Sequence, residues 1–341
     1  MVRYLVVTFL MLAFVSCGKG KSGDSGNPML GDVNIQTVIK TDSSGTVSFT
    51  VSAANTIGYN FDFGDGTLQS ITDGKVTYKY AASGNYTVNV VVSGTGGQSK
   101  SKSVTIGVGV KLNLVWSDEF NVPGAPDPTK WTFDLGTGSG GWGNNELEYY
   151  TSRPENVAIS NGTLKIIARK EPYNGSAYTS ARMLTQGLYS FKYGKIEVNA
   201  KLPAGIGTWP AIWMLGNNIS SVAWPACGEM DIMEQNGSQK NLIYGTLHYP
   251  TQVNPYGDGG TTTVSDANDA FHKYSAVWTP SSIKLLVDDV VFYTLPNTNT
   301  LPFNQNFFII LNVAIGGNFG GTVDPSFTSG QMEIDYIRVY Q

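Results

Sequence analysis

The sequence predicts an all-β protein of two unequal sandwiches behind an export signal. Three observations predict this class. Short segments that alternate apolar and polar residues fill most of the chain, and 40 glycines supply tight turns. Charged residues make up only 14%, where about 25% is usual for a globular protein. A length of 341 residues suits two domains.

The charge balance excludes several classes of partner. Lys and Arg number 22 and Asp and Glu 26, a net charge of −4. A nucleic-acid-binding protein needs a basic face, and docking on anionic lipid needs clustered Lys or Arg, so we expect neither. Two His and two Cys make a His/Cys zinc site improbable and exclude a disulfide framework. We therefore expect a monomer with an uncharged partner.

A short apolar segment lies directly behind the initiator methionine. Arg3 precedes thirteen mostly apolar residues, Tyr4–Ser16, and Cys17 follows at once. Thirteen residues are too few to span a bilayer, which needs ~20, so the segment is typical of the apolar region of an export signal. It resembles a bacterial lipoprotein signal. The resemblance implies that residues 1–17 form the signal peptide and that Cys17 carries the lipid.

This resemblance implies an exported lipoprotein of the bacterial outer membrane, at the cell surface or on the periplasmic face. Its only membrane contact is then the N-terminal lipid. The alternative is an ordinary secretory signal in which Cys17 has no role. Residues 18–32, rich in Gly, Ser and Lys, predict a flexible tether. If Cys17 is lipidated, Cys227 has no partner, and we expect a buried free thiol there.

The segment 33–110 predicts the smaller sandwich. Four alternating segments are separated by turn signals such as Gly64–Gly66; they are Val47–Ala53, Tyr59–Phe63, Val76–Ala81 and Tyr86–Val92. The order strand, Phe-Gly-Asp-Gly, strand resembles the PKD domain, which implies an immunoglobulin-like sandwich. We expect Asp62 and Asp65 to cap the turn backbone. The segment is interpreted as a spacer, with glycan binding as the alternative.

The segment 112–341 predicts one large β-sandwich, because its strands continue with no amphipathic helix of normal length. The clearest strands are Lys195–Leu202, Asn241–Tyr249, Lys273–Thr279, Ile283–Leu295, Phe307–Ile315 and Met332–Tyr340. All seven Trp residues lie in this segment. Pyranose rings have apolar faces that stack on indole rings, so a sugar groove is expected here.

Three carboxylates fall within six residues of an otherwise apolar stretch, as Glu229, Asp231 and Glu234. Each would cost several kcal/mol if it were desolvated without a partner. Glu229 and Asp231 are two residues apart and share one face of a strand, whereas Glu234 falls on the opposite face. A β-bulge with Ile232 or Met233 as the extra residue would return Glu234 to the face of Glu229.

The stretch Glu-Met-Asp-Ile-Met-Glu resembles the Glu-x-Asp-x-x-Glu signature of glycoside hydrolase family 16, in its bulged, laminarinase-like form. Other segments resemble the same family in the expected order; they are Trp116–Asn121, Gly141–Thr151, Tyr178–Gly187, Tyr193–Leu215, Gly245–Tyr249, Leu311–Gly321 and Ile334–Gln341. The resemblance implies a concanavalin-like jelly-roll with a sugar cleft on its concave face. It also implies double displacement without a cofactor, with Glu229 as nucleophile, Glu234 as acid/base and Asp231 as the helper that hydrogen-bonds the nucleophile.

Five further residues are predicted to bind substrate. Trp209 and Trp213 are four apart, so on a strand both can face the cleft; the alternative is the core. The resemblance places His248 near the acidic trio, bonded to substrate or to Asp231 rather than satisfied in the core. It also places Asn145 and Arg182 in the cleft, and Arg182 has a surface salt bridge as its alternative. Glu146 and Gln235 are further candidates.

Some members of the family carry a structural calcium. The matching positions are the backbone carbonyls of Glu119 and Gly162 and the carboxylate of Asp335, oxygen ligands that suit calcium. The alternative is a hydrated pocket. The resemblance implies an endo-acting β-glucanase for laminarin, a β-1,3-glucan, and for mixed-linkage β-1,3-1,4-glucan. The alternatives are a tethered, non-catalytic glycan-binding protein and a family member that acts on a galactan.

Overall fold

The computed structural model describes residues 28–250 and 257–341. The predicted signal and Cys17 lie outside the described residues, as does the first part of the predicted tether. Within the described ranges, no helix is both long and apolar enough to cross a membrane. The described helices are three segments of three to five residues, so the protein is nearly all β, as predicted.

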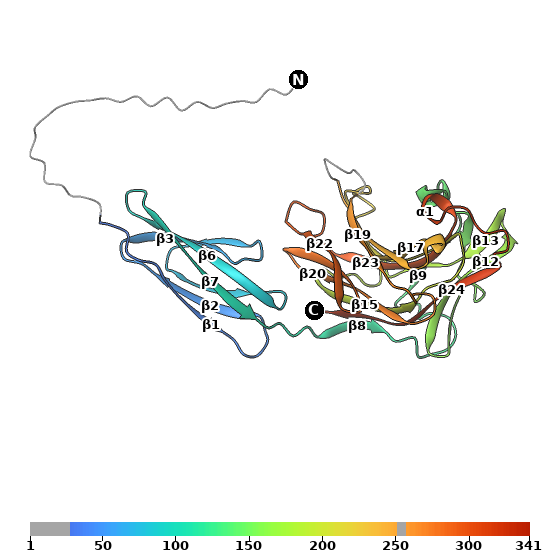
Figure 1. Ribbon diagram of the computed structural model, residues 1–341, viewed down its shortest axis with the longest axis horizontal. Helices are drawn as coiled ribbons and strands as arrows, with labels where there is room; N and C mark the ends of the chain where they lie inside the picture. Colours follow the sequence, from blue (N-terminus) through green and yellow to red (C-terminus); the bar gives the residue numbers. More distant parts are fainter. Residues whose placement is uncertain (1–27, 251–256) are drawn as a thin grey trace, which may run out of the picture.

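Residues 34–108 form two antiparallel sheets with a core of their own (Figure 1). One sheet has the order β1-β2-β5, from Asn34–Ile39, Thr46–Ser52 and Lys75–Lys79. The other has the order β4-β3-β6-β7, from Leu68–Ile71, Thr56–Asp62, Gly84–Gly94 and Ser99–Val108. Asp62 accepts a hydrogen bond from the backbone N–H of Gly64, and Asp65 from that of Thr67. The predicted turn caps are confirmed.

The larger unit stacks a seven-stranded and a ten-stranded sheet (Figure 1). The first has the order β19-β18-β17-β16-β23-β14-β9, from Asp258–Thr263, Leu242–His248, Glu229–Gln235, Thr208–Gly216, Phe307–Ile315, Arg182–Leu184 and Thr132–Asp134. The second follows β10-β13-β12-β24-β15-β20-β21-β22, from Glu148–Tyr150, Ser176–Ser180, Thr163–Tyr173, Ser329–Tyr340, Gly194–Lys201, His272–Trp278, Ser282–Val287 and Val290–Pro296. Two further strands join this sheet, β11 (Val157–Ser160) on β12 and β8 (Leu114–Asp118) on β24.

One predicted strand is wrong. Ile283–Leu295 was expected to be continuous, but it is the hairpin of β21 and β22. Asp288 and Asp289 have φ of 48° and 66° at its turn. Two successive residues with positive φ are typical of a two-residue hairpin turn, and Asp tolerates this backbone region better than most residues. The apolar runs on both sides, Leu285–Val287 and Val290–Phe292, concealed the break.

The two faces of the seven-stranded sheet have different environments. On β23, Ile309, Leu311 and Val313 join the core between the sheets. The alternate residue Asn312 points to the other face, which carries the cleft. The period of two along a strand thus separates core from site. Cys227 is a buried free thiol, as predicted.

We predict that residues 112–341 fold without the segment before them, because no strand of sheets β1-β2-β5 and β4-β3-β6-β7 joins the larger sheets. A chain that starts at Lys111 should unfold cooperatively within about 3 °C of the corresponding transition of the full chain. Differential scanning calorimetry measures this. A midpoint lowered by more than about 10 °C would show that the first sandwich supports the second.

Candidate active site

Strand β17 carries a β-bulge. Against β16, Ile212 pairs with Met233 and Trp213 pairs with Asp231, so Ile232 has no partner of its own. Against β18, the two residues that follow Asp231 oppose a single residue. The predicted bulge is confirmed, and Ile232 is the extra residue.

The bulge brings the three acids to one face. Glu229, Asp231 and Glu234 all line a cleft of about 990 Å³ on the outer face of the seven-stranded sheet. Ile232 and Met233 are fully buried in the core behind them. Without the extra residue, Glu234 would point into that core. The local backbone irregularity therefore decides whether this strand can carry a site.

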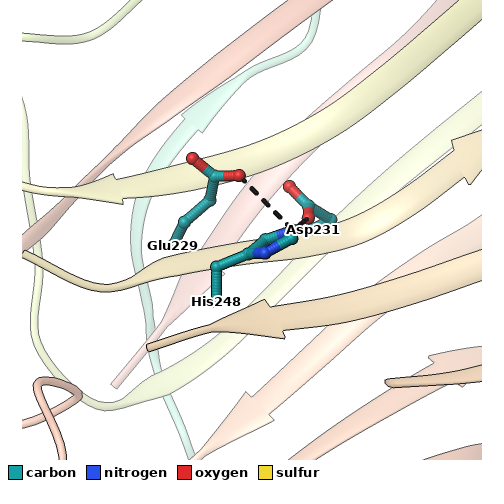
Figure 2. A group of neighbouring side chains, drawn as sticks. All are labelled: Glu229, Asp231 and His248. Carbon is teal, nitrogen blue, oxygen red and sulfur yellow. Dashed lines mark ion pairs between the residues drawn. The ribbon is translucent and has the colours of Figure 1, made fainter. Parts of the chain in front are cut away.

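His248 joins Glu229 and Asp231 (Figure 2). It lies opposite Glu229 on β18, and its Nε2 is 2.9 Å from Asp231 Oδ2 and 3.7 Å from Glu229 Oε1. The predicted contact between His248 and Asp231 is confirmed. Burial, and then the neighbouring Asp231 carboxylate, raise the pKa of Glu229, while His248 acts in the opposite direction. Burial also raises the pKa of Asp231.

Glu234 has a different environment at the other end of the strand. The indole N–H of Trp209 donates to Glu234 Oε1 at 2.9 Å. Burial, and then the charge of Asp231, raise the pKa of Glu234 to about 8. Glu234 thus keeps its proton near neutral pH, which is the state a general acid requires. Because the pKa of Glu229 is raised in the same direction, the two glutamates differ in their partners, His248 beside Glu229 and Trp209 on Glu234.

Arg182 lies between two indole rings of the cleft wall. Its guanidinium carbon is 4.7 Å from the ring centre of Trp142 and 4.8 Å from that of Trp213. Its Nε is 3.0 Å from Asp134 Oδ2, the residue opposite it in the sheet. Trp209 and Trp213 both line the cleft, as expected, and so does Arg182. The ion pair neutralises the one arginine of the cleft lining.

A hydrogen-bonded network that the sequence analysis missed supports Trp213. The indole N–H of Trp213 donates to Asn312, and the Asn312 amide donates to the Tyr150 hydroxyl. Tyr150 donates to Glu146, which lines the cleft. Glu148 accepts the backbone N–H of Ile315, and burial raises its pKa well above the usual range. The alternation of Glu146, Glu148 and Tyr150 was the sequence signal for one shared strand face.

Asn145 was predicted to face the cleft, and this prediction is wrong. Its side-chain amide donates to Asn318 Oδ1, and the neighbouring Asn144 and Glu146 line the cleft instead. The cause is local, because Trp142 and Asn145 have positive φ of 55° and 57°. A left-handed turn orients side chains differently from a strand or a right-handed helix. Asn145 therefore braces the wall through Asn318.

Gln235 is a fully buried residue of the fold. Its side-chain amide donates to the Lys240 carbonyl, and its carbonyl oxygen accepts from Asn268. Gln235 directly follows Glu234 on the strand and therefore points to the opposite face, into the core. Gln235 supports the turn after β17.

The three predicted calcium ligands lie around one gap in the ten-stranded sheet. Along β24, pairing with β12 ends at Ile334 and pairing with β8 begins at Ile337, which leaves Asp335 at the gap. Glu119 follows β8 and Gly162 precedes β12, so both lie next to this gap.

The side chains at this gap are compatible with the predicted donors. Both carboxylate oxygens of Glu119 accept from Arg338, at 3.0 and 2.7 Å, and the predicted donor of Glu119 is its backbone carbonyl. Asp335 accepts from Asn199 at 3.0 Å. Backbone and carboxylate oxygens are the donors that calcium prefers. Calcium at this gap stays a prediction.

Two glutamates on one face of a strand, with different partners and in a cleft lined by indole rings, are the arrangement of a glycoside hydrolase site. The chain belongs to glycosyl hydrolases family 16, whose family model matches residues 144–338. A second model, for the beta-glucan synthesis-associated proteins SKN1/KRE6/Sbg1, matches residues 50–229 and so ends at the first residue of the acidic trio.

Similar proteins cover about two thirds of this chain. A β-glucanase of Rhodothermus marinus is 46% identical over 67% of this chain and 85% of its own length. The laminarinase structure from the same organism has a TM-score of 0.65 at 44% identity and covers 68% of this chain and 98% of that one. A structure of a non-specific endo-β-1,3(4)-glucanase of family GH16, crystallised with 1,3-β-D-cellotriosyl-glucose, has a TM-score of 0.64 at 43% identity. The match covers 68% of this chain and 95% of that one.

Relatives named for other functions also match. A keratan-sulfate endo-1,4-β-galactosidase of Sphingobacterium multivorum is 33% identical over 67% of this chain and 55% of its own length. A β-1,3-glucan-binding protein of Penaeus monodon is 31% identical over 48% of this chain and 63% of its own length. The substrate therefore has to be argued from the cleft itself.

We predict that Glu234→Gln stabilises the protein at alkaline pH. A carboxyl group whose pKa is about 8 when folded and about 4.5 when unfolded opposes folding increasingly as pH rises through this window. Gln removes this cost and keeps an oxygen that accepts from Trp209. The melting temperature at pH 9 should rise by about 5 °C, roughly 2 kcal/mol for a domain of this size.

At pH 4 the Glu234 carboxyl group is mostly protonated in both the folded and the unfolded protein. Glu234→Gln should therefore have little effect on the melting temperature at this pH. Glu155→Gln is the matched control, because Glu155 is exposed and distant in sequence from the trio. Thermal unfolding followed by circular dichroism at the two pH values gives the comparison. An equal shift at pH 4 and pH 9 would contradict burial as the cause.

Proposed function

We propose that this protein is an endo-acting β-glucanase. It hydrolyses the β-1,3 linkages of laminarin-like glucan, and mixed-linkage β-1,3-1,4-glucan in the same cleft, by a retaining double displacement. The observation that carries the proposal is the bulged strand that presents Glu229, Asp231 and Glu234 together, with Glu234 held protonated. The printed names of the most similar relatives agree with this substrate class.

The two glutamates divide the reaction. A carboxylate oxygen of Glu229 attacks the anomeric carbon while Glu234 gives its proton to the departing glycosidic oxygen. The bond from that carbon to the leaving oxygen breaks as the covalent glycosyl–enzyme forms. Glu234, now ionised, takes a proton from water, whose oxygen attacks the same carbon and releases Glu229. Two inversions give net retention.

The neighbours of the glutamates suit these roles. His248 faces Glu229 and Asp231, so its N–H can stabilise negative charge on the nucleophile side. Trp209 donates to Glu234 and orients its carboxyl group. Two carboxyl groups with different hydrogen-bonding partners in one cleft are the arrangement that acid and nucleophile chemistry needs.

The charge of the cleft favours a neutral glucan over a sulfated galactan. Four acidic side chains line it, Glu146, Glu229, Asp231 and Glu234, and its arginine, Arg182, is paired with Asp134. Among the described residues of the lining, a sulfate ester would find no unpaired Lys or Arg to receive it. A purely binding role would leave a buried acidic trio unexplained, because each desolvated carboxyl group disfavours folding.

We also propose the division of the chain into a lipoprotein signal (1–17), a tether (18–32), a PKD-like sandwich (33–110) and the catalytic domain (112–341). The two-sheet architecture of residues 34–108 supports the third assignment. Among the described residues, the one group of His, Cys, Asp and Glu with metal-ligand spacing is Glu229, Asp231 and His248. The first sandwich is therefore best explained as a spacer.

The test of function uses laminarin and the two glutamate variants. The unmodified protein should release reducing ends from laminarin, and Glu229→Ala or Glu234→Ala should lose most of this activity, since acid–base catalysis alone supplies about 10²–10⁴-fold. With an activated aryl glycoside, azide should restore turnover in both. Glu229→Ala should give the α-glycosyl azide, because azide replaces the nucleophile. Glu234→Ala should give the β-azide, because azide intercepts the glycosyl–enzyme.

Glu155→Ala is the control for a single exposed carboxyl group and should keep full activity. The same azide anomer from both variants would overturn the division of roles. Absence of reducing ends from laminarin with the unmodified protein, together with binding of the same glucan, would favour the glycan-binding alternative. Release from a sulfated galactan but not from laminarin would favour the galactan alternative.

The lipid anchor gives a separate prediction. Cys17→Ala should move the protein from the membrane fraction to the soluble fraction, because lipidation needs the thiol and the apolar segment before it is short. Hydrolysis of soluble laminarin per mole of protein should not change, since the cleft lies in residues 142–319. Fractionation followed by immunoblotting measures the first and an assay of reducing ends the second. Retention of the variant in membranes would place the anchor elsewhere.

A further inference from the structure

Glu148 is a buried carboxyl group that the proposed reaction does not use. It lies on β10, two residues after Glu146 of the cleft lining, and it has no exposed surface. Its Oε2 accepts the backbone N–H of Ile315 at 2.6 Å. Among residues 28–250 and 257–341, no N–H or O–H group donates to Oε1, which is also buried. A charged carboxylate with one oxygen unsatisfied in this way would strongly disfavour folding.

A second carboxyl group, that of Glu146, is hydrogen-bonded to Glu148. Glu146 is half-buried and has a donor on each oxygen, since Asn144 donates to Oε1 at 3.1 Å and Tyr150 to Oε2 at 2.9 Å. Two donors and contact with the cleft favour the charged form of Glu146. A hydrogen bond between two carboxyl groups requires a proton on one of them. The surroundings therefore assign the charge to Glu146 and the proton to Glu148.

The electrostatics of the pair agree with this assignment. Burial, then the charge of Glu146 and then the hydrogen bond with Glu146 raise the pKa of Glu148 well above its usual range. The other titratable groups around the pair are Tyr150 on the same strand, Tyr178 as the register partner on β13, and Arg182, whose charge acts on Tyr150. Strand β23, which meets Glu148 at its last residue, carries no titratable side chain.

The charge on Glu146 sets the direction of the hydrogen bonds along the cleft wall. An ionised carboxylate can only accept, so Tyr150 donates to it, and the hydroxyl oxygen of Tyr150 accepts from the Asn312 amide at 3.0 Å. The carbonyl oxygen of Asn312 is then left for the indole N–H of Trp213, at 2.8 Å. Because Trp213 lines the cleft, the state of the buried pair reaches the cleft surface.

We propose that Glu148 is a positioning residue that works as a neutral carboxylic acid. Its O–H group donates to the Glu146 carboxylate, so the pair holds one proton and one negative charge. This third donor fixes Glu146 as the acceptor from which the hydrogen-bonded chain to Trp213 begins. The positioning role rests on the proposed function, whereas the shared proton does not.

Infrared spectroscopy at pH 7 tests the proton directly. A protonated carboxyl group has a C=O stretching band separate from those of carboxylates and amides. This band should lose intensity in Glu148→Gln and stay unchanged in Glu155→Gln, the exposed control. Protonated groups of the acidic trio contribute equally to all these spectra and cancel in the difference. An unchanged band in Glu148→Gln would overturn the proposal, because Glu148 would then be ionised.

Kinetics on laminarin test the positioning role. The Gln amide donates and accepts without charge, so Glu148→Gln should keep KM and kcat within about twofold. Leu has a similar size but no polar group, so Glu148→Leu should raise KM about tenfold, the loss expected from a buried hydrogen bond. Tyr150→Phe breaks the same chain one step later and should raise KM by a similar factor. The double variant should be no worse than either single one, because both act through one chain.

Tyr150→Phe should keep the infrared band that Glu148→Gln loses, since the proton lies on the near side of the break. Equal losses in Glu148→Gln and Glu148→Leu, or additive losses in the double variant, would overturn the positioning role. The infrared band, Glu148→Gln and Tyr150→Phe still decide the proposal if Glu148→Leu does not fold. The band in a protein that hydrolyses no laminarin would refute the proposed function and leave the shared proton standing.

Discussion

The burial of three carboxyl groups on one strand is the constraint on which the rest of the site depends. Charged carboxylates are costly to desolvate, and the pKa values of Glu229, Asp231 and Glu234 are all raised for that reason. The bulge at Ile232 keeps all three on the cleft face. His248 and Trp209 then give the two ends of the row different partners. A local change of register thus places the three carboxyl groups together in the cleft, with different partners at the two ends of the row.

The larger sandwich holds this strand at its centre. β17 pairs with β16 and β18 on its two sides, and the fully buried strand β23 lies beyond β16. The cleft walls come from segments far apart in the sequence, which meet through the Arg182 stack and through the chain of bonds from Trp213 to Glu146. Rigid sheet positions hold the reacting groups, and short loops supply the walls, which is how precise sites are usually supported.

The face of a strand on which a side chain lies was predictable from the sequence, because side chains alternate with a period of two residues. The bulge followed from the odd spacing between Glu229 and Glu234, and the shared face of Trp209 and Trp213 followed from their even spacing. Features that depend on contacts between distant segments were not. The side chain of Asn145 is directed by a left-handed turn, and the position of Arg182 between two indoles requires three strands or loops to meet. The hairpin at Asp288 was hidden because apolar runs flank its turn on both sides.

We propose that Glu229 and Glu234 act as nucleophile and acid/base in a retaining reaction. Proton NMR during the first minutes of hydrolysis of a β-glucan tests it most directly, because the anomeric signal of the new reducing end reports the number of inversions at that carbon. The β-anomer should appear first, and the α-anomer should grow only as the product mutarotates. An α-anomer formed first would mean a single inversion, and the assignment of Glu229 as nucleophile would be wrong.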